Sequence, residues 1–250
     1  MVRKFKGIKQ LSTAAVGHII DIARKTVRNK GFCTIVMAGG STPRLTYELL
    51  STPVNAEKMP WRQSHFFWGD ERWVSLTHPD SNYAMAHTAL LAKVSIPARN
   101  IHQIRTDDTN PEEGAARYEN HLRDFFHTKP PAEMKSLAEN LSVPRFDVVL
   151  LGMGADGHTA SLFPESNLLA EKKKWVAPVP AGVGSPPVAR ITLTLPVLNG
   201  AKNIFFLISG KVKIALLDTI LTRPAEAQKL YPAALIKPAG NLVWLTSEQE

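Results

Sequence analysis

The chain is poor in the features that mark several classes of protein. Its 250 residues include one cysteine, Cys33, so no internal disulfide bond can form, which fits a reducing compartment. No apolar run approaches the ~20 residues that span a bilayer. No signal-peptide apolar stretch follows the basic N-terminus. We therefore expect a protein of the cytoplasm that makes no membrane contact.

Several chemical motifs are also missing. No His-Glu-x-x-His, cysteine pair or acidic triplet has metal-ligand spacing, so no metal site is predicted. No Gly-x-Ser-x-Gly turn supplies a serine nucleophile. The net charge is +8, but no helix-turn-helix, zinc-finger or RNP-like signature accompanies it, so nucleic acid is not an expected partner. The charge suits an anionic small-molecule substrate.

What is present is the pattern of a globular α/β protein, with 44% apolar and 21% charged residues. Short apolar runs predict strands at 32–38, 65–69, 101–104, 146–151, 175–179, 190–195, 203–208 and 241–245, the last of which closes the sheet. Apolar residues at helical spacing predict helices at 11–30, 41–50, 82–92, 111–127 and 211–221. Residues 128–145, with three prolines, predict a loop or a short broken helix.

Strands that alternate with helices favour one α/β domain over residues 1–250, with a mainly parallel sheet. In such sheets ligands bind at the carboxyl ends of the strands. Candidate chemistry is therefore expected where strands end in glycine turns or polar residues.

The first such end is Gly39-Gly40-Ser41-Thr42-Pro43. The two glycines allow close backbone approach, and the following helix N-terminus offers free N–H groups that suit a phosphate. Ser41 or Thr42 can cap that helix, with Pro43 in its first turn. A plain strand–turn–helix connection is the alternative. Neither a Walker A loop nor a dinucleotide fingerprint is complete here.

Asp70-Glu71-Arg72 lies just past the end of the strand at 65–69. Arg72 can bind an oxyanion, while Asp70 binds hydroxyl groups or positions Arg72. The alternative is a solvated loop, because charged residues are mostly exposed.

The third motif is the glycine-rich run 152–164, which follows the cleanest predicted strand. It presents Asp156 and His158 beside Gly152, Gly154 and Gly157. Histidine titrates near neutrality, so His158 can act as a general base and then as a general acid. A structural histidine is the alternative.

A fourth candidate is the first turn of the helix after Ser209-Gly210. Lys211 or Lys213 at a helix N-terminus faces an unfavourable dipole, which a bound phosphate would compensate. Spacing does not choose between the two lysines, and a surface lysine is the alternative.

Together these residues resemble the 6-phosphogluconolactonase family over nearly the whole chain. The most specific match is Asp-Gly-His-Thr-Ala-Ser-Leu-Phe-Pro at 156–164; the other matches are 39–43, 69–72 with Ser81-Asn82-Tyr83, 190–199 and the segment around Trp244. One departure is Ser75, where the family pattern has proline.

The resemblance implies a Rossmann-like fold with a small additional β/α subregion. It also implies hydrolysis of 6-phospho-D-glucono-1,5-lactone in the oxidative pentose phosphate pathway, without metal or cofactor. His158 would activate water, with Arg72 and Asp70 at the lactone. The substrate and its phosphate would lie against Gly39, Gly40, Ser41, Thr42, Gly154, Asp156, Gly157, Arg190 and Lys213, the family lysine matching Lys213. Monomer and homodimer both fit the sequence.

Three other functions compete with this interpretation. Deaminases of glucosamine 6-phosphate share the Asp-Gly-His loop but continue with Ile-Ala-Phe-Asn-Glu-Pro. This chain continues with Thr-Ala-Ser-Leu-Phe-Pro at 159–164, and its first carboxylate comes after the proline, at Glu165. Release of ammonia would distinguish them. A non-catalytic sugar-phosphate sensor would need a DNA-binding segment, and a nucleic-acid-binding protein a clustered basic face. The sequence shows neither.

Overall fold

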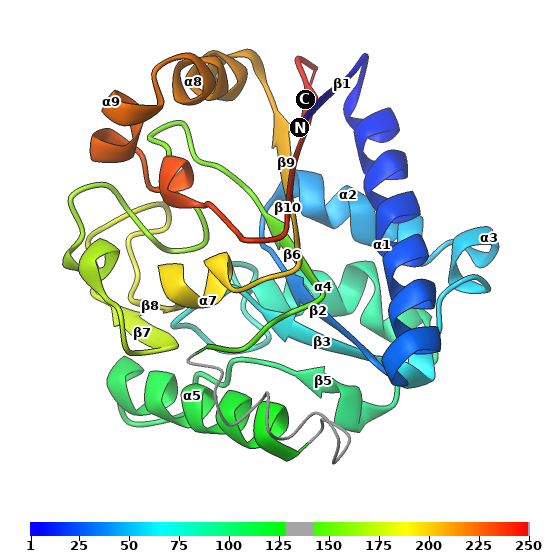
Figure 1. Cartoon of the computed structure of the whole chain (residues 1–250). Helices are drawn as coiled ribbons and strands as arrows, with labels where there is room; N and C mark the ends of the chain where they lie inside the picture. The colour runs from blue at the N-terminus through cyan, green and yellow to red at the C-terminus, as the bar shows by residue number, and fades with distance from the viewer. Residues whose placement is uncertain (129–142, 250) are drawn as a thin grey trace.

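The main sheet has seven parallel strands in the order β1-β10-β9-β6-β2-β3-β5 (Figure 1). The computed structural model describes residues 1–128 and 143–249; most of the segment predicted as loop or broken helix, 128–145, lies outside them. The strands are Val2–Phe5 (β1), Cys33–Met37 (β2), Ser64–Trp68 (β3), Ile101–His102 (β5), Val148–Leu151 (β6), Asn203–Ser209 (β9) and Asn241–Ser247 (β10).

The direction of the strand order reverses between β2 and β6. From β2 the chain continues through β3 to β5 at one edge, whereas β6 leads through β9 and β10 toward the other. At such a reversal the connections leave the two strands on opposite faces of the sheet and open a crevice at its carboxyl edge. The fold therefore places its natural ligand position beyond the ends of β2 and β6.

Helices cover both faces of this sheet. Figure 1 shows α1 (Ile8–Lys30) and α2 (Ser41–Leu50) on one side, and α7 (Leu195–Asn199), α8 (Lys211–Thr222) and α9 (Pro224–Leu230) on the other. α4 (Asn82–Ala89) packs against α2. The other helices in the described residues are α3 (Pro53–Ala56), α5 (Pro111–Thr128) and the 3-10 turns Trp61–Gln63, Leu91–Lys93, Ala98–Asn100, Asn167–Ala170 and Pro232–Leu235.

A second, antiparallel sheet joins β4 (Asp70–Arg72), β8 (Arg190–Leu193) and β7 (Val176–Val179) in the order β4-β8-β7. α5 packs against β7 and β8. In this sheet Arg72 pairs with Arg190. The predicted α/β class, with a mainly parallel sheet and a small extra subregion, is confirmed.

The central strands β2, β3 and β6 are buried along their whole length. Strands covered by helices on both faces need apolar residues on both faces, which is why they appear in the sequence as continuous apolar runs. α1 ends as predicted at Gly31, whose φ of 84° lets its N–H bond to the carbonyl of Val27. Within the described residues, no helix combines the length and apolar character needed to cross a membrane.

Three local predictions are wrong. The strand at the C-terminus does not close the sheet, because the unpredicted β1 pairs on its outer side. The Asp70–Arg72 segment is not a solvated loop but the short strand β4, stabilised by its pairing with β8. Neither Ser41 nor Thr42 caps α2: Gly40 is the N-cap, and both hydroxyl residues lie in the first turn together with Pro43.

Candidate active site

A cavity of about 200 Å³ lies beyond the carboxyl ends of β2, β6 and β9. Ten of the twelve predicted site residues line it: Gly39, Gly40, Ser41, Thr42, Asp70, Arg72, Gly154, His158, Arg190 and Lys213. The other two, Asp156 and Gly157, belong to the loop that carries His158 and do not line the cavity. Lys213 lines it and Lys211 does not. The fold thus brings together motifs from four separate parts of the chain.

Two helix N-termini meet at one side of this cavity. α2 follows β2 through Gly40, and α8 follows β9 through Gly210; both glycines have φ near 100°, a conformation that side chains disfavour. Thr42 Oγ1 and Ser209 Oγ lie 2.9 Å apart and join the two turns. The free N–H groups and the partial positive charge of a helix N-terminus make this end of the cavity suited to an anion such as phosphate.

His158 is held by a carboxylate in its own loop. Its Nδ1 lies 2.6 Å from Asp156 Oδ1, which also accepts the His158 backbone N–H at 3.2 Å. An ionised carboxylate only accepts hydrogen bonds, so Nδ1 of the neutral ring carries the proton and Nε2 presents its lone pair. Nε2 is therefore the nitrogen available to take a proton in the cavity.

A tight turn links the histidine loop to the second motif. Thr159 and Leu162 exchange backbone hydrogen bonds around Ala160, whose φ is 48°, and Ser161. A positive φ is uncommon for a residue with a side chain and marks a constrained turn. The turn lets the buried Ser161 Oγ donate to Asp70 Oδ2 at 2.6 Å.

Two arginines bring positive charge to the cavity. Arg72 donates from NH1 to the Asp80 carbonyl at 2.7 Å, and Arg190 from NH2 to the Pro186 carbonyl at 2.9 Å. Burial lowers the pKa of Arg190, and the Asp70 carboxylate counteracts part of that shift. In the part of the chain that the structure describes, the buried Nε atoms of both arginines lack hydrogen-bond partners. Buried donors without partners are costly, so both side chains are suited to an anionic ligand.

Glu71 points away from this cavity and is 1% exposed. Burial raises the pKa of its carboxyl to about 7, against the opposing effect of backbone N–H donors from Tyr83, Asn82 and Arg72. A buried carboxyl therefore lies between two residues that line the cavity.

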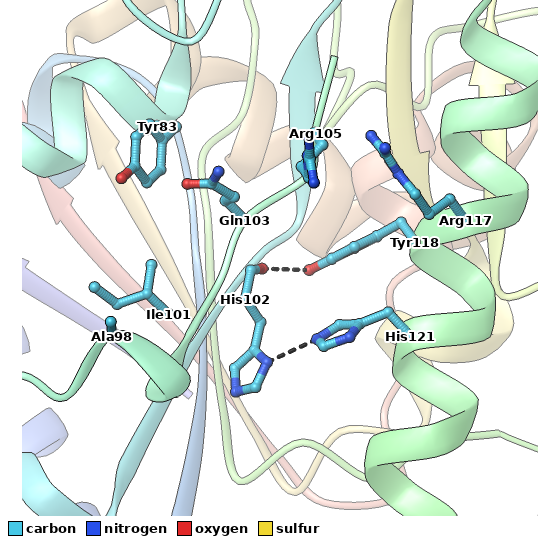
Figure 2. A pocket seen from close by; sticks show the side chains of 9 residues that line it. All are labelled: Tyr83, Ala98, Ile101, His102, Gln103, Arg105, Arg117, Tyr118 and His121. Atoms are coloured by element: carbon cyan, nitrogen blue, oxygen red, sulfur yellow. Dashed lines mark hydrogen bonds between the residues drawn. The ribbon is translucent and has the colours of Figure 1, made fainter. Parts of the chain in front are cut away.

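A larger cavity of about 420 Å³ lies beside the edge strand β5 and is shown in Figure 2. None of the predicted site residues lines it. Its cationic groups already have partners: Arg105 pairs with Asp107, and Arg117 with Asp107 and Asp108. The cavity at the strand ends, which gathers the four motifs, is therefore the candidate active site.

Sequence reasoning missed several residues that shape the site. Asn82 lines the cavity and donates hydrogen bonds to Asp70. Ser161 donates to the Asp70 carboxylate, and Ser209 bonds to Thr42 in the first turn of α2. Asn82 directly follows Ser81, which caps α4 through a hydrogen bond from the Ala84 N–H. The capping serine and the family resemblance at Ser81-Asn82-Tyr83 were therefore the signals that the sequence offered for that segment. In residues 1–128 and 143–249, no group of three or more His, Cys, Asp or Glu has a metal-binding arrangement.

The fold and this cavity define a parallel α/β protein with a polar, cationic ligand site at its strand ends. Comparison with known proteins agrees. A family profile described as glucosamine-6-phosphate isomerases/6-phosphogluconolactonase matches residues 7–244. The chain therefore belongs to the glucosamine-6-phosphate isomerase/6-phosphogluconolactonase family.

Individual relatives carry the lactonase name. A 6-phosphogluconolactonase of Nostoc sp. is 43% identical over 237 residues, which cover 93% of this chain and 91% of the relative. A 6-phosphogluconolactonase of Synechocystis sp. is 41% identical over 225 residues, which cover 90% of this chain and 86% of the relative. The crystal structure of the Thermotoga maritima 6-phosphogluconolactonase has a TM-score of 0.80 and 30% identity, covering 99% of each chain.

Proposed function

We propose that this protein hydrolyses 6-phospho-D-glucono-1,5-lactone to 6-phospho-D-gluconate, in the oxidative pentose phosphate pathway. The observation that carries the proposal is the His158–Asp156 pair, in which Asp156 engages Nδ1 and His158 lines a cavity that is also lined by two arginines and the start of α2. The names of the relatives support the same reaction.

The reaction proceeds by attack of water on C1 of the lactone. The water oxygen bonds to C1 while His158 Nε2 takes a proton from that water molecule, and the carbonyl oxygen becomes an oxyanion. The guanidinium group of Arg72, which lines the cavity, stabilises this charge. The C1–ring oxygen bond then breaks, and His158 returns the proton to the departing ring oxygen. The lactone carbonyl is already an activated ester, so no covalent nucleophile is needed.

The phosphate of the substrate binds away from His158, at the donors that the N-terminal turns of α2 and α8 supply. Ser41 and Thr42 supply hydroxyl and N–H groups at the start of α2, and Lys213 supplies positive charge from α8. Arg190, which also lines the cavity, adds a second positive charge. Phosphate binding away from C1 orients the lactone for attack and converts a bimolecular encounter into a positioned reaction.

On this proposal the chain supplies the base, the oxyanion donors and the phosphate site, and the reaction requires neither metal nor cofactor. The single domain over 1–250, the cytoplasmic location and the choice between monomer and homodimer stay predictions from the sequence.

The decisive assay measures hydrolysis of freshly generated 6-phosphogluconolactone, coupled to 6-phosphogluconate dehydrogenase, with the spontaneous rate subtracted. Wild type should accelerate hydrolysis, and His158→Ala should lower kcat by about 10²- to 10⁴-fold, the usual contribution of a general base. His87→Ala, a change at an exposed histidine outside the cavity, is the control and should leave the rate unaltered. No acceleration by wild type would refute the proposed reaction, and full activity of folded His158→Ala would refute the assigned base.

A further inference from the structure

Two of the three residues of β4 are bonded to one short segment, 80–83, which leads into α4. Arg72 NH1 donates to the Asp80 carbonyl at 2.7 Å. Asn82 Nδ2 donates to the carbonyl of Asp70 at 2.9 Å and to its Oδ1 at 3.3 Å. The two β4 side chains that line the cavity are thus both held by this segment.

The third β4 residue, Glu71, accepts four hydrogen bonds, three of them from the same segment. Its Oε1 accepts the backbone N–H groups of Arg72 at 2.8 Å and Asn82 at 2.7 Å. Its Oε2 accepts the Ser81 hydroxyl at 3.0 Å and the Tyr83 N–H at 2.8 Å. One carboxylate therefore joins β4 to three consecutive residues of the segment.

Strand geometry explains this division of roles. Successive side chains of a strand point to opposite faces, so Asp70 and Arg72 face the cavity while Glu71 faces the protein interior. Glu71 does not line the cavity and has no route to the substrate. The Asn82 side chain packs directly against the backbone of Gly39, because a Cβ at position 39 would lie 2.0 Å from Asn82 Oδ1.

We propose that Glu71 is a positioning residue: its buried carboxylate clamps segment 81–83 onto β4 and thereby sets the places of Asp70 and Arg72 at the reacting end of the substrate. The inference rests on the proposed lactonase function. The proposed reaction steps do not use Glu71 or Ser81-Asn82-Tyr83, and the inference explains these residues as the contact that positions β4.

A carboxylate is required because all four partners are donors. A glutamine retains one acceptor oxygen, and its amide nitrogen would oppose the Tyr83 N–H or the backbone donors on the other side. Burial of a charge is costly even with partners, and such groups often stabilise a fold no better than apolar ones. The gain from Glu71 therefore lies in the geometry it imposes.

The test compares Glu71→Gln with wild type in the coupled lactonase assay, together with binding of the product 6-phosphogluconate by calorimetry. We expect kcat to fall by about 10- to 100-fold, the scale of loss that a displacement of about 1 Å causes. KM and the product Kd should stay within about threefold of wild type, because the phosphate end of the cavity is untouched.

Glu119→Gln is the matched control. Glu119 also accepts two backbone N–H groups through one oxygen, from Trp175 at 2.9 Å and Val176 at 3.1 Å, and it does not line the cavity. It should lower the melting temperature without lowering kcat. A purely structural role for Glu71 would make the two variants behave alike.

Active wild type together with a folded Glu71→Gln whose kcat is within about twofold of wild type would overturn the inference and leave the proposed function intact. An inactive wild type would overturn both. If Glu71→Gln does not fold, Ser81→Gly decides, because it removes the hydroxyl donor to the carboxylate, leaves three backbone donors and keeps a residue that is favourable at the N-cap of α4. A fall in its kcat with KM retained supports the clamp, and an unchanged kcat overturns it.

Discussion

Gly154 lies directly against the ring of His158: a Cβ built at position 154 would stand 2.2 Å from His158 Nδ1 and 2.4 Å from Asp156 Oδ1. No real Cβ tolerates such distances, so only glycine leaves room for the pair. The glycine in this loop is therefore a steric requirement of the histidine–carboxylate contact.

Gly154→Ala should separate His158 from Asp156 and lower kcat by about 100-fold, since misplacement of a catalytic group by about 1 Å has that effect. Gly17→Ala is the control, because no atom lies within 4 Å of a Cβ at that position, its φ is not positive and it does not line the cavity. Steady-state kinetics of the two variants check the prediction. Equal activity in both would show that the contact does not matter for the rate.

Asp156→Asn keeps a hydrogen-bond acceptor for Nδ1 but removes the negative charge that stabilises a protonated ring. We expect kcat to fall by about 10- to 100-fold, within the range of general acid–base contributions, with little change in KM. The lactonase assay at pH 7 measures both constants. A variant as fast as wild type would show that Asp156 only shapes the loop.

Lys213→Ala should raise KM for the lactone by about tenfold or more, the value of a charge-assisted hydrogen bond, and leave kcat nearly unchanged. Lys211→Ala removes the same charge from an exposed residue that does not line the cavity, so its KM should stay close to that of wild type. Parallel KM measurements decide. The same rise in both variants would mean that overall positive charge, and not a specific contact, binds the phosphate.

Asp147 is a buried carboxylate at the opposite end of β6 from the cavity, bonded to Lys30 at 2.8 Å and Lys202 at 2.9 Å. Burial alone would raise its pKa, but the two ammonium groups outweigh burial and hold the pKa below its ordinary value. A depressed carboxyl pKa contributes stability that is present above the unfolded pKa and is lost as pH falls through the folded value.

Asp147→Asn should therefore lower the free energy of unfolding at pH 7 by about 3 kcal/mol, as expected when one partner of a buried ion pair is removed. The difference from wild type should shrink as pH falls below about 4, the ordinary carboxyl range. Urea unfolding followed by tryptophan fluorescence measures both effects. Glu48→Gln, which breaks the exposed Arg44 pair, is the control and should change stability by less than about 1 kcal/mol. A pH-independent difference would contradict the assignment.

Local sequence signals predicted much of this site. The helix that ends at Gly31 and the apolar strands were visible because periodicity and glycine punctuation act over a few neighbouring residues. The glycine-rich turns at 39–40 and 152–154 marked the strand ends at which the cavity lies. Boundaries differed by a few residues, as with the strand predicted at 190–195, which ends at Leu193 before the Leu195–Asn199 helix begins.

Pairing between distant segments could not be predicted in this way. β4 has only three residues, all charged, and is a strand only because β8, more than a hundred residues later, bonds to it. The Thr42–Ser209 contact spans 167 residues. The place of β1 outside β10 likewise depends on pairing between the two ends of the chain.

The amino-acid sequence by itself determined the α/β class, the strand–glycine–helix units and the identity of the groups that face the cavity, since each is encoded in adjacent residues. Only the tertiary structure decided which of these groups meet. It placed Lys213 and not Lys211 at the cavity, paired His158 with Asp156, and buried Glu71 beneath Asp70 and Arg72. The physical reason is that such contacts follow from strand order, register and side-chain direction, and these are set by the packing of the whole chain.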